Sequence, residues 1–263
     1  MMAIHKTLSD PGVNGALATT GPAIFGRDEE LEQLRKRFVA RRSFLFHGPA
    51  GVGKTLLLRL AFPEFTDVLF SPQNPTPQSL YRNLAESLLG LEHPVLTKSC
   101  LRGMESLQAK TATSVKGLVR DALHNSKYLV IVDHLVRPSQ AMATSIRELM
   151  LKWSVPVIAV SRSAHMEDAG FVLPLFPDRS ERFSLKNFDS EPARRFAAVC
   201  AERQGITAKN IEQFLDRVVE YSDGNPGAVL QMIRMAKAPK YSCQNQIKIT
   251  PLYIDYRIAT VSQ

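Results

Sequence analysis

The sequence has few cysteines, and they form no recognisable pattern. Cys100, Cys200 and Cys243 are the only three among 263 residues, and they lie far apart without the spacing of metal ligands. An odd number of dispersed cysteines argues against a disulfide framework and favours reduced thiols. We therefore expect a cytoplasmic protein.

Long apolar runs are missing as well. No stretch approaches the ~20 apolar residues that a membrane-spanning helix needs. The first 22 residues lack the apolar core of a signal peptide and are rich in Gly, Ala, Thr and Pro. We expect no membrane partner, and we interpret residues 1–22 as a flexible N-terminal segment.

The remaining composition is that of an ordinary globular chain. Apolar residues make up 44% and charged residues 22%, which is enough for a real hydrophobic core. Lys and Arg outnumber Asp and Glu, so the formal net charge is +8 and the pI is about 9.5. This excess permits an anionic partner such as nucleic acid but does not require one.

Residues 23–187 alternate between helical and strand patterns. Helices are expected at 28–40, 53–62, 76–90, 114–126 and 139–154, with Gly90 as an end signal. Strands are expected at 42–48, 66–71, 127–134 and 155–163, with a turn and a last short strand within 173–185. Residues 94–111 give no clear pattern. Short apolar strands separated by helices predict an α/β fold, a parallel sheet in a three-layer αβα arrangement.

The pattern changes after residue 187. Three helical segments at 189–205, 207–224 and 225–238 predict a small helical lobe over 188–238. The tail, residues 239–263, is less clear. Alternation in IKITPLYIDY, residues 247–256, is compatible with a strand, and the beginning of a further domain is the alternative.

The stretch HGPAGVGKTLLL, residues 47–58, carries the spacing G-x-x-x-x-G-K-T of a P-loop. Its backbone N–H groups at a helix start can meet the charge of a phosphate chain, and its glycines let the main chain curl. Lys54 is expected to reach the β- and γ-phosphates, and the Thr55 hydroxyl to ligate Mg²⁺. The predicted phosphate-binding residues are Gly48, Pro49, Ala50, Gly51, Val52, Gly53, Lys54, Thr55 and Leu56.

A second metal-binding carboxylate is expected at the end of a strand. Asp133 follows the apolar run LVIV, and ligands gather at the carboxyl ends of strands in open α/β sheets. We assign it as the Walker B aspartate, which shares the metal with Thr55. One strand–helix unit separates it from the P-loop, which predicts the additional-strand type of P-loop NTPase.

Further segments resemble STAND ATPases, including the NB-ARC class, and related origin-recognition-type AAA+ proteins. PAIFGRDEEL resembles their hhGRxxE box, VIAVSRS their sensor strand, and SDGNPGAVLQMI the Gly-x-Pro helix start of their lid lobe. With the P-loop and Asp133 between them, these segments follow the order of the families from residue 22 to 233. The resemblance implies ATP or ADP and Mg²⁺ as ligands.

The resemblance also implies roles for individual residues. Phe25, Gly26 and Arg27 would line the adenine side, and Pro226 would press on the base from the lid. Arg162 would reach the γ-phosphate and report ATP against ADP. The alternatives are a plain surface arginine at Arg162 and an ordinary turn and helix start at Pro226.

Two more residues bear on hydrolysis. In ring-forming relatives an arginine near Arg182 acts in trans on a neighbour's γ-phosphate, and a solvated turn arginine is the alternative. ATP-hydrolysing relatives usually carry an acidic residue after the Walker B aspartate, and this chain has His134. A neutral imidazole lacks the fixed negative charge, so we predict tight nucleotide binding with slow turnover. The predicted catalytic residues are Lys54, Asp133, His134, Arg162 and Arg182.

Three functions compete at this point. The first is a nucleotide-dependent switch whose lid movement drives self-association or binding of a protein partner. The second is a DNA-associated AAA+ ATPase, although no winged helix or other base-reading motif is recognisable. The third, a metabolic kinase or GTPase, lacks the base-recognition motif NKxD. The densest basic run, RKRFVARR at 35–42, is expected to be a solvated helix face near the nucleotide phosphates, with a DNA-binding patch as the alternative.

Overall fold

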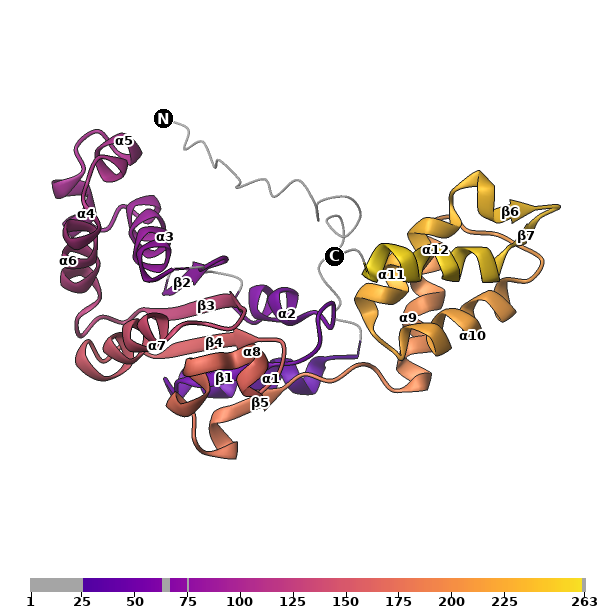
Figure 1. Cartoon of the computed structure of the whole chain (residues 1–263), viewed down its shortest axis with the longest axis horizontal. Helices are drawn as coiled ribbons and strands as arrows, with labels where there is room; N and C mark the ends of the chain where they lie inside the picture. Colours follow the sequence, from indigo (N-terminus) through magenta and orange to yellow (C-terminus); the bar gives the residue numbers. More distant parts are fainter. Residues whose placement is uncertain (1–25, 63–66, 75, 262–263) are drawn as a thin grey trace.

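The computed structural model describes residues 26–62, 67–74 and 76–261. Figure 1 shows a sheet flanked by helices and, beside it, a lobe made mostly of helices. Residues 1–22 and Phe25, whose roles were predicted from the sequence, lie outside the described residues. Within the described residues, no helix is both long and apolar enough to cross a membrane.

The sheet has five parallel strands in the order β2-β3-β4-β1-β5. The strands are β1 (Phe44–His47), β2 (Val68–Ser71), β3 (Leu129–Leu135), β4 (Val157–Ser161) and β5 (Arg182–Ser184). Strand β4 lies between β1, which leads into the P-loop, and β3, which carries Asp133. This confirms the additional-strand arrangement that the sequence predicted.

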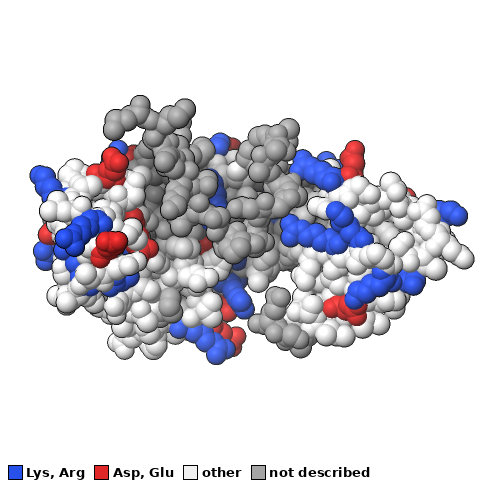
Figure 2. Space-filling model, turned by 90° about the horizontal axis from the view of Figure 1, so that it is seen from above, with Lys and Arg blue, Asp and Glu red and all other residues white. Residues whose placement is uncertain are grey.

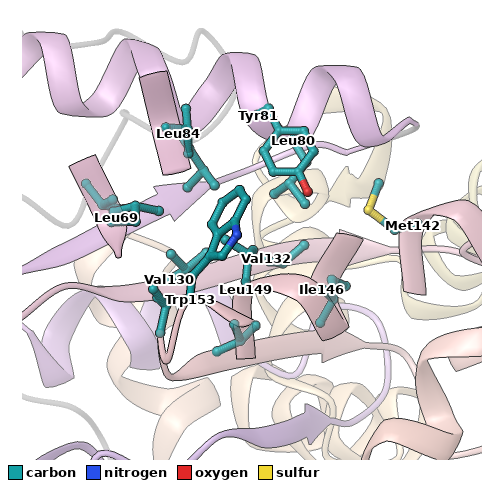
Figure 3. Packing of buried hydrophobic residues seen from close by; sticks show 14 of the residues in the cluster. Leu69, Leu80, Tyr81, Leu84, Val130, Val132, Met142, Ile146, Leu149 and Trp153 are labelled. Atoms are coloured by element: carbon teal, nitrogen blue, oxygen red, sulfur yellow. The ribbon is translucent and has the colours of Figure 1, made fainter. Parts of the chain in front are cut away.

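Both faces of the sheet are covered, because successive residues of each strand point to opposite sides. In β3, Leu129 and Ile131 belong to one buried cluster, together with residues of α1 and α2. Val130 and Val132 belong to the other, with residues of α3, α6 and α7. Figure 3 shows Trp153 and Leu84 within this second cluster, above Val130 and Val132. The three-layer αβα prediction is therefore confirmed.

The helices around the sheet match the expected segments closely. They are α1 (Asp28–Val39), α2 (Lys54–Ala61), α3 (Pro77–Gly90), α4 (Pro94–Ser99), α5 (Met104–Gln108), α6 (Ala112–Leu123), α7 (Gln140–Arg147) and α8 (Met166–Ala169). A π-helical turn, Glu148–Lys152, continues α7. The unassigned residues 94–111 form α4 and α5. Gly90 is the last residue of α3, but the left-handed residue after it is Glu92, with φ 55°.

The lobe has its own core. It contains α9 (Ser190–Arg203), α10 (Ile211–Ser222), α11 (Pro226–Ala236), α12 (Ile249–Val261) and a hairpin of β6 (Ser242–Cys243) and β7 (Gln246–Ile247). Phe214, Val229 and Leu252 are fully or almost fully buried together in it.

A strand over residues 247–256 is wrong, because α12 occupies most of them. Pro251 stands in the first turn of α12, where its missing N–H costs no helical hydrogen bond. Leu252 is buried in the lobe core, and Tyr253 stacks on Tyr221 of α10 with ring centroids 3.9 Å apart. The alternating pattern was therefore overridden by packing against the lobe.

Candidate nucleotide site

The P-loop has the curled shape that its glycines allow. Gly53, directly before α2, has φ +99°, a conformation that side chains disfavour. At Gly48 the constraint is space, because a Cβ there would lie 2.2 Å from the carbonyl oxygen of Leu185. The loop thus passes close to the segment after β5 and enters α2 at Lys54.

Lys54 lies inside this loop. Its Nζ donates to the carbonyl oxygens of Gly48 at 2.6 Å and Pro49 at 2.9 Å. Burial lowers the pKa of Lys54 to about 8; Arg162 acts in the same direction, whereas Asp133 and Asp168 oppose it. A cation desolvated in this way favours an anionic ligand, which would restore its charge stabilisation.

Thr55 and Asp133 meet at the adjacent strand end. The Thr55 hydroxyl donates to Oδ2 of Asp133 at 2.7 Å, and Asp133 is only 2% exposed. Burial opposes ionisation of this carboxyl, but hydrogen bonds from His134 and Thr55 hold its pKa below the usual value. A hydroxyl and a charged carboxylate are hard oxygen donors that fit Mg²⁺, which binds few protein ligands and keeps water and phosphate oxygens. Among the described residues no cluster of three or more His, Cys, Asp or Glu offers a fuller cage.

His134 sits in a bulge of β3. The register with β4 shifts between Val132 and Leu135, and His134 has φ +53°. Its backbone N–H donates to Oδ1 of Asp133 at 2.7 Å, and its Nδ1 lies 3.3 Å from Oδ2. The hydrogen bond with Asp133 raises the pKa of His134, so the ring is a poorer proton acceptor at neutral pH than the unperturbed imidazole expected from sequence.

A polar network beside Asp133 was not predicted. Asn74, 8% exposed, donates to the carbonyl oxygens of Ser71 at 2.9 Å and Asp133 at 3.4 Å. Asn83 of α3 donates to the Ser71 hydroxyl at 3.0 Å. The signal was available, since Ser71 and Asn74 follow an apolar strand and so belong to the same edge as Asp133.

Arg162 follows β4 and lines a cavity of about 510 Å³ together with Gly48 and Pro49. The cavity lies where β1, β4 and β5 end and where the chain leads to the lobe. Arg162 is exposed, and its charge acts on Lys54. This places Arg162 on the phosphate side of the site, while its role toward a γ-phosphate stays a prediction.

Arg27 is buried directly before α1. It is 8% exposed, and its guanidinium donates to Glu30 at 2.7 Å and to the carbonyl of Lys186 at 2.6 Å. It also lies 4.2 Å from the ring centre of Phe188. Arg27 therefore ties α1 to the segment that links β5 to the lobe. The adenine-side role of Gly26 and Arg27 stays a prediction, as does that of Pro226, which is buried at the start of α11.

Arg182 is engaged within its own loop. Its Nε donates to the carbonyl of Phe176 at 2.9 Å, and Nη2 to that of Pro177 at 3.2 Å. These bonds fix the entry to β5 and favour the structural alternative for Arg182. A role in trans would require the side chain to leave them.

The basic run at 35–42 is not near the P-loop, so that expectation is wrong. Arg41 donates to the carbonyls of Ser126, Lys127 and Tyr128, which precede β3, and Arg37 donates to that of Ser180, ahead of β5. Both therefore lie at the amino end of the sheet, opposite the P-loop. On the face that Figure 2 shows, Lys and Arg lie on both the sheet domain and the lobe, with Asp and Glu among them.

The lobe touches the P-loop directly. At the start of α11 the N–H of Gly227 donates to the carbonyl of Gly51 at 3.0 Å, and Nδ2 of Asn225 donates to that of Ala50 at 2.9 Å. The Gly-x-Pro resemblance pointed to this turn, but not to Asn225 or to the P-loop main chain as its partner.

No protein-family model matches the sequence, and no curated protein does. Solved structures do match. A Walker-type ATPase of Pyrococcus abyssi superposes with a TM-score of 0.59 at 15% sequence identity. The superposition covers 91% of this chain and 74% of the Pyrococcus chain. This chain has the fold of a P-loop ATPase.

Two other similar structures are of proteins bound to DNA. The ORC1 protein of Aeropyrum pernix in complex with DNA has a TM-score of 0.58 at 15% identity and covers 89% of this chain. Drosophila ORC bound to DNA has a TM-score of 0.60 at 11% identity and covers 94%. The present chain spans 65% and 64% of those two chains.

Proposed function

We propose that this protein is an ATP-binding molecular switch of the STAND/AAA+ type, with Mg·ATP held by the P-loop. The observation that carries the proposal is the convergence of Lys54, Thr55 and Asp133. The half-buried ammonium group of Lys54 lies inside the loop, and the Thr55 hydroxyl is 2.7 Å from the Asp133 carboxylate. This is the pairing of charge and hard oxygen donors that a magnesium-bound triphosphate needs.

Each residue of the site would have a separate role in nucleotide binding. Backbone N–H groups of the P-loop and Lys54 bind the phosphates, and Thr55 with Asp133 would hold Mg²⁺, which neutralises phosphate charge when bound. Arg162 would sense the γ-phosphate from the end of β4. The lobe, docked on the P-loop, would change its position between the ATP and ADP forms and so expose a surface for self-association or a protein partner.

Slow hydrolysis follows from His134. Its ring faces Asp133, its pKa is raised, and it occupies the position directly after Asp133, where an acidic residue would act as the base. The assistance of a general base, typically ~10²- to 10⁴-fold in rate, would therefore be weak. A switch with a long-lived ATP state agrees with this chemistry.

Titration calorimetry tests the proposal. A folded sample should bind Mg·ATP and Mg·ADP, and removal of Mg²⁺ with a chelator should weaken ATP binding. Size-exclusion chromatography with each nucleotide should show a change in oligomer size or in partner binding. Absence of heat with any adenine nucleotide would overturn the proposal.

A DNA-associated ATPase is the second candidate. The net charge of +8 and the two DNA-bound neighbours favour it. Against it, Arg37 and Arg41, two cations of the densest basic run, are bound to carbonyls of the chain itself. A salt titration of DNA binding decides, because contacts with phosphates give a steep log–log slope.

A further inference from the structure

The P-loop presents two of its carbonyl groups to the lobe. The carbonyls of Gly48 and Pro49 accept from Lys54 inside the loop, whereas those of Ala50 and Gly51 face outward and need partners of their own. The Ala50 carbonyl accepts from Nδ2 of Asn225 at 2.9 Å, and the Gly51 carbonyl accepts from the N–H of Gly227 at 3.0 Å. Both donors belong to the turn that starts α11.

The two main chains pack without space for a side chain between them. A Cβ on Gly227 would lie 2.8 Å from Cα of Gly51 and 2.9 Å from its carbonyl oxygen. A Cβ on Gly51 would lie 2.7 Å from Oδ1 of Asn225. Distances under 3 Å force one partner to move, so this contact depends on glycine at both positions.

Asn225 joins three parts of the protein. Its Oδ1 accepts from the N–H of Ala228 at 3.1 Å and so caps α11. Its Nδ2 also lies 3.1 Å from Oδ1 of Asn187, in the linker between β5 and the lobe. The linker is fixed to the same turn, since the N–H of Phe188 donates to the carbonyl of Gly224 at 3.0 Å. The P-loop, the linker and α11 are therefore joined at one residue.

We propose that Asn225 and Gly227 are positioning residues that brace the P-loop from outside, so that lid docking and nucleotide affinity are coupled. With the lid docked, the outward carbonyls of Ala50 and Gly51 are satisfied and the inward N–H groups are held for phosphate. With the lid displaced, the loop loses both partners. Linkage then requires nucleotide to favour the docked lid by the same factor. This inference rests on the proposed nucleotide binding and adds how the lid controls it.

Asn225→Ser is the decisive variant. Serine keeps the cap on α11 but is too short to reach the Ala50 carbonyl. The Nδ2 group also donates to Asn187, so serine loses both contacts of that group. Loss of the one hydrogen bond to the P-loop, of ordinary strength, predicts about fivefold faster amide hydrogen exchange in the P-loop of the nucleotide-free protein, and about fivefold weaker binding of Mg·ATP. The melting temperature should stay close to that of the wild type, which separates positioning from simple destabilisation.

Gly227→Ala should have a larger effect, because its Cβ must push the lid off Gly51. We expect at least tenfold weaker Mg·ATP binding and faster exchange in both the P-loop and the first turn of α11. Two controls match these variants. Asn210→Ala removes a side chain whose hydrogen bonds, among the described residues, go to Ile247 inside the lobe. Gly117→Ala adds a methyl group in α6, where no described atom outside the helix's own backbone and the neighbouring residues lies within 4 Å. Neither should change P-loop exchange or ATP affinity.

Hydrogen exchange distinguishes failure of this inference from failure of the proposed function. If the wild type binds no nucleotide but Asn225→Ser still speeds hydrogen exchange in the P-loop, the positioning role of Asn225 is supported and the proposed ATP binding is wrong. If the wild type binds Mg·ATP while Asn225→Ser and Gly227→Ala match it in P-loop exchange and affinity, the positioning role of Asn225 and Gly227 is overturned. Equal effects of Asn210→Ala and Asn225→Ser would also overturn it, because any loosened lobe would then act alike.

Discussion

The two ends of the sheet hold cations in different environments. At the carboxyl end, Lys54 is largely buried in the P-loop, and burial lowers its pKa to about 8. At the amino end, Arg41 is exposed and its guanidinium joins the carbonyls of Ser126, Lys127 and Tyr128. Both cations donate to main-chain carbonyls, but burial disfavours the charge of Lys54, which an anion could stabilise, whereas Arg41 stays exposed to solvent. The cations of this sequence therefore serve two purposes: Lys54 is placed to bind an anion, and Arg41 stabilises the fold.

Lys54→Met should have the largest effect on the carboxyl end. Methionine retains most of the packing of the stem and removes the charge, so Mg·ATP affinity should fall at least about 100-fold, the loss of a charge-assisted hydrogen bond to phosphate. The melting temperature should hold or rise, because a desolvated cation disappears. Calorimetry and thermal unfolding measure the two quantities. Affinity within about fivefold of the wild type would show that Lys54 is not the phosphate cation.

His134→Glu comes next, because it changes the chemistry beside Asp133 without touching the P-loop. We expect ATP turnover to rise by about 10- to 100-fold, the lower part of the range for a general base. The left-handed backbone at His134, with φ +53°, disfavours glutamate and limits the gain.

His134→Gln is the control for this rise, since it removes the imidazole and adds no base. Steady-state phosphate release compares the three proteins at saturating Mg·ATP. Equal rates for the Glu and Gln variants would show that another group governs the water.

The sequence signals for the carboxyl end of the sheet are local. Gly48, Gly53, Lys54 and Thr55 lie within eight residues, and Asp133 follows a run of apolar residues that only a buried strand explains. The bulge at His134 was missed because it arises from pairing with β4, and the contact of Asn225 with Ala50 joins residues 175 positions apart. Spacing along the chain carries no information about either.

The amino end and the tail were misjudged for a related reason. A run of cations such as residues 35–42 gives charge but not position, and the position was set by the strand that follows at Phe44. In the tail, alternation over 247–256 predicted a strand, whereas burial of Leu252 in the lobe selected a helix. In both places contacts between distant parts of the chain determined the structure, which the local sequence pattern alone does not specify.

The pH dependence of ATP affinity sharpens the contrast between lysine and arginine. Phosphate binds the protonated form of Lys54, so affinity falls as pH rises through its unbound pKa of about 8. From pH 7 to pH 9 the protonated fraction, and with it the affinity, should fall about tenfold. Lys54→Arg should bind with a flat profile over this range, because a guanidinium stays charged. A wild-type profile as flat as that of the arginine variant would contradict the lowered pKa.

Arg41→Ala tests the amino end and should have the smallest effect. Its three carbonyl contacts are exposed to solvent, so their loss should lower the free energy of unfolding by about 1 kcal/mol, measured by urea titration. The adjacent Arg42→Ala is the matched control, since within the described part of the chain its side chain makes none of the hydrogen bonds that Arg41 makes. Neither variant should change Mg·ATP affinity, because both residues precede β1 at the end away from the P-loop. If Arg41→Ala weakened ATP binding as much as it weakened folding, the separation of the two ends would fail, and the basic run would have to act on the nucleotide after all.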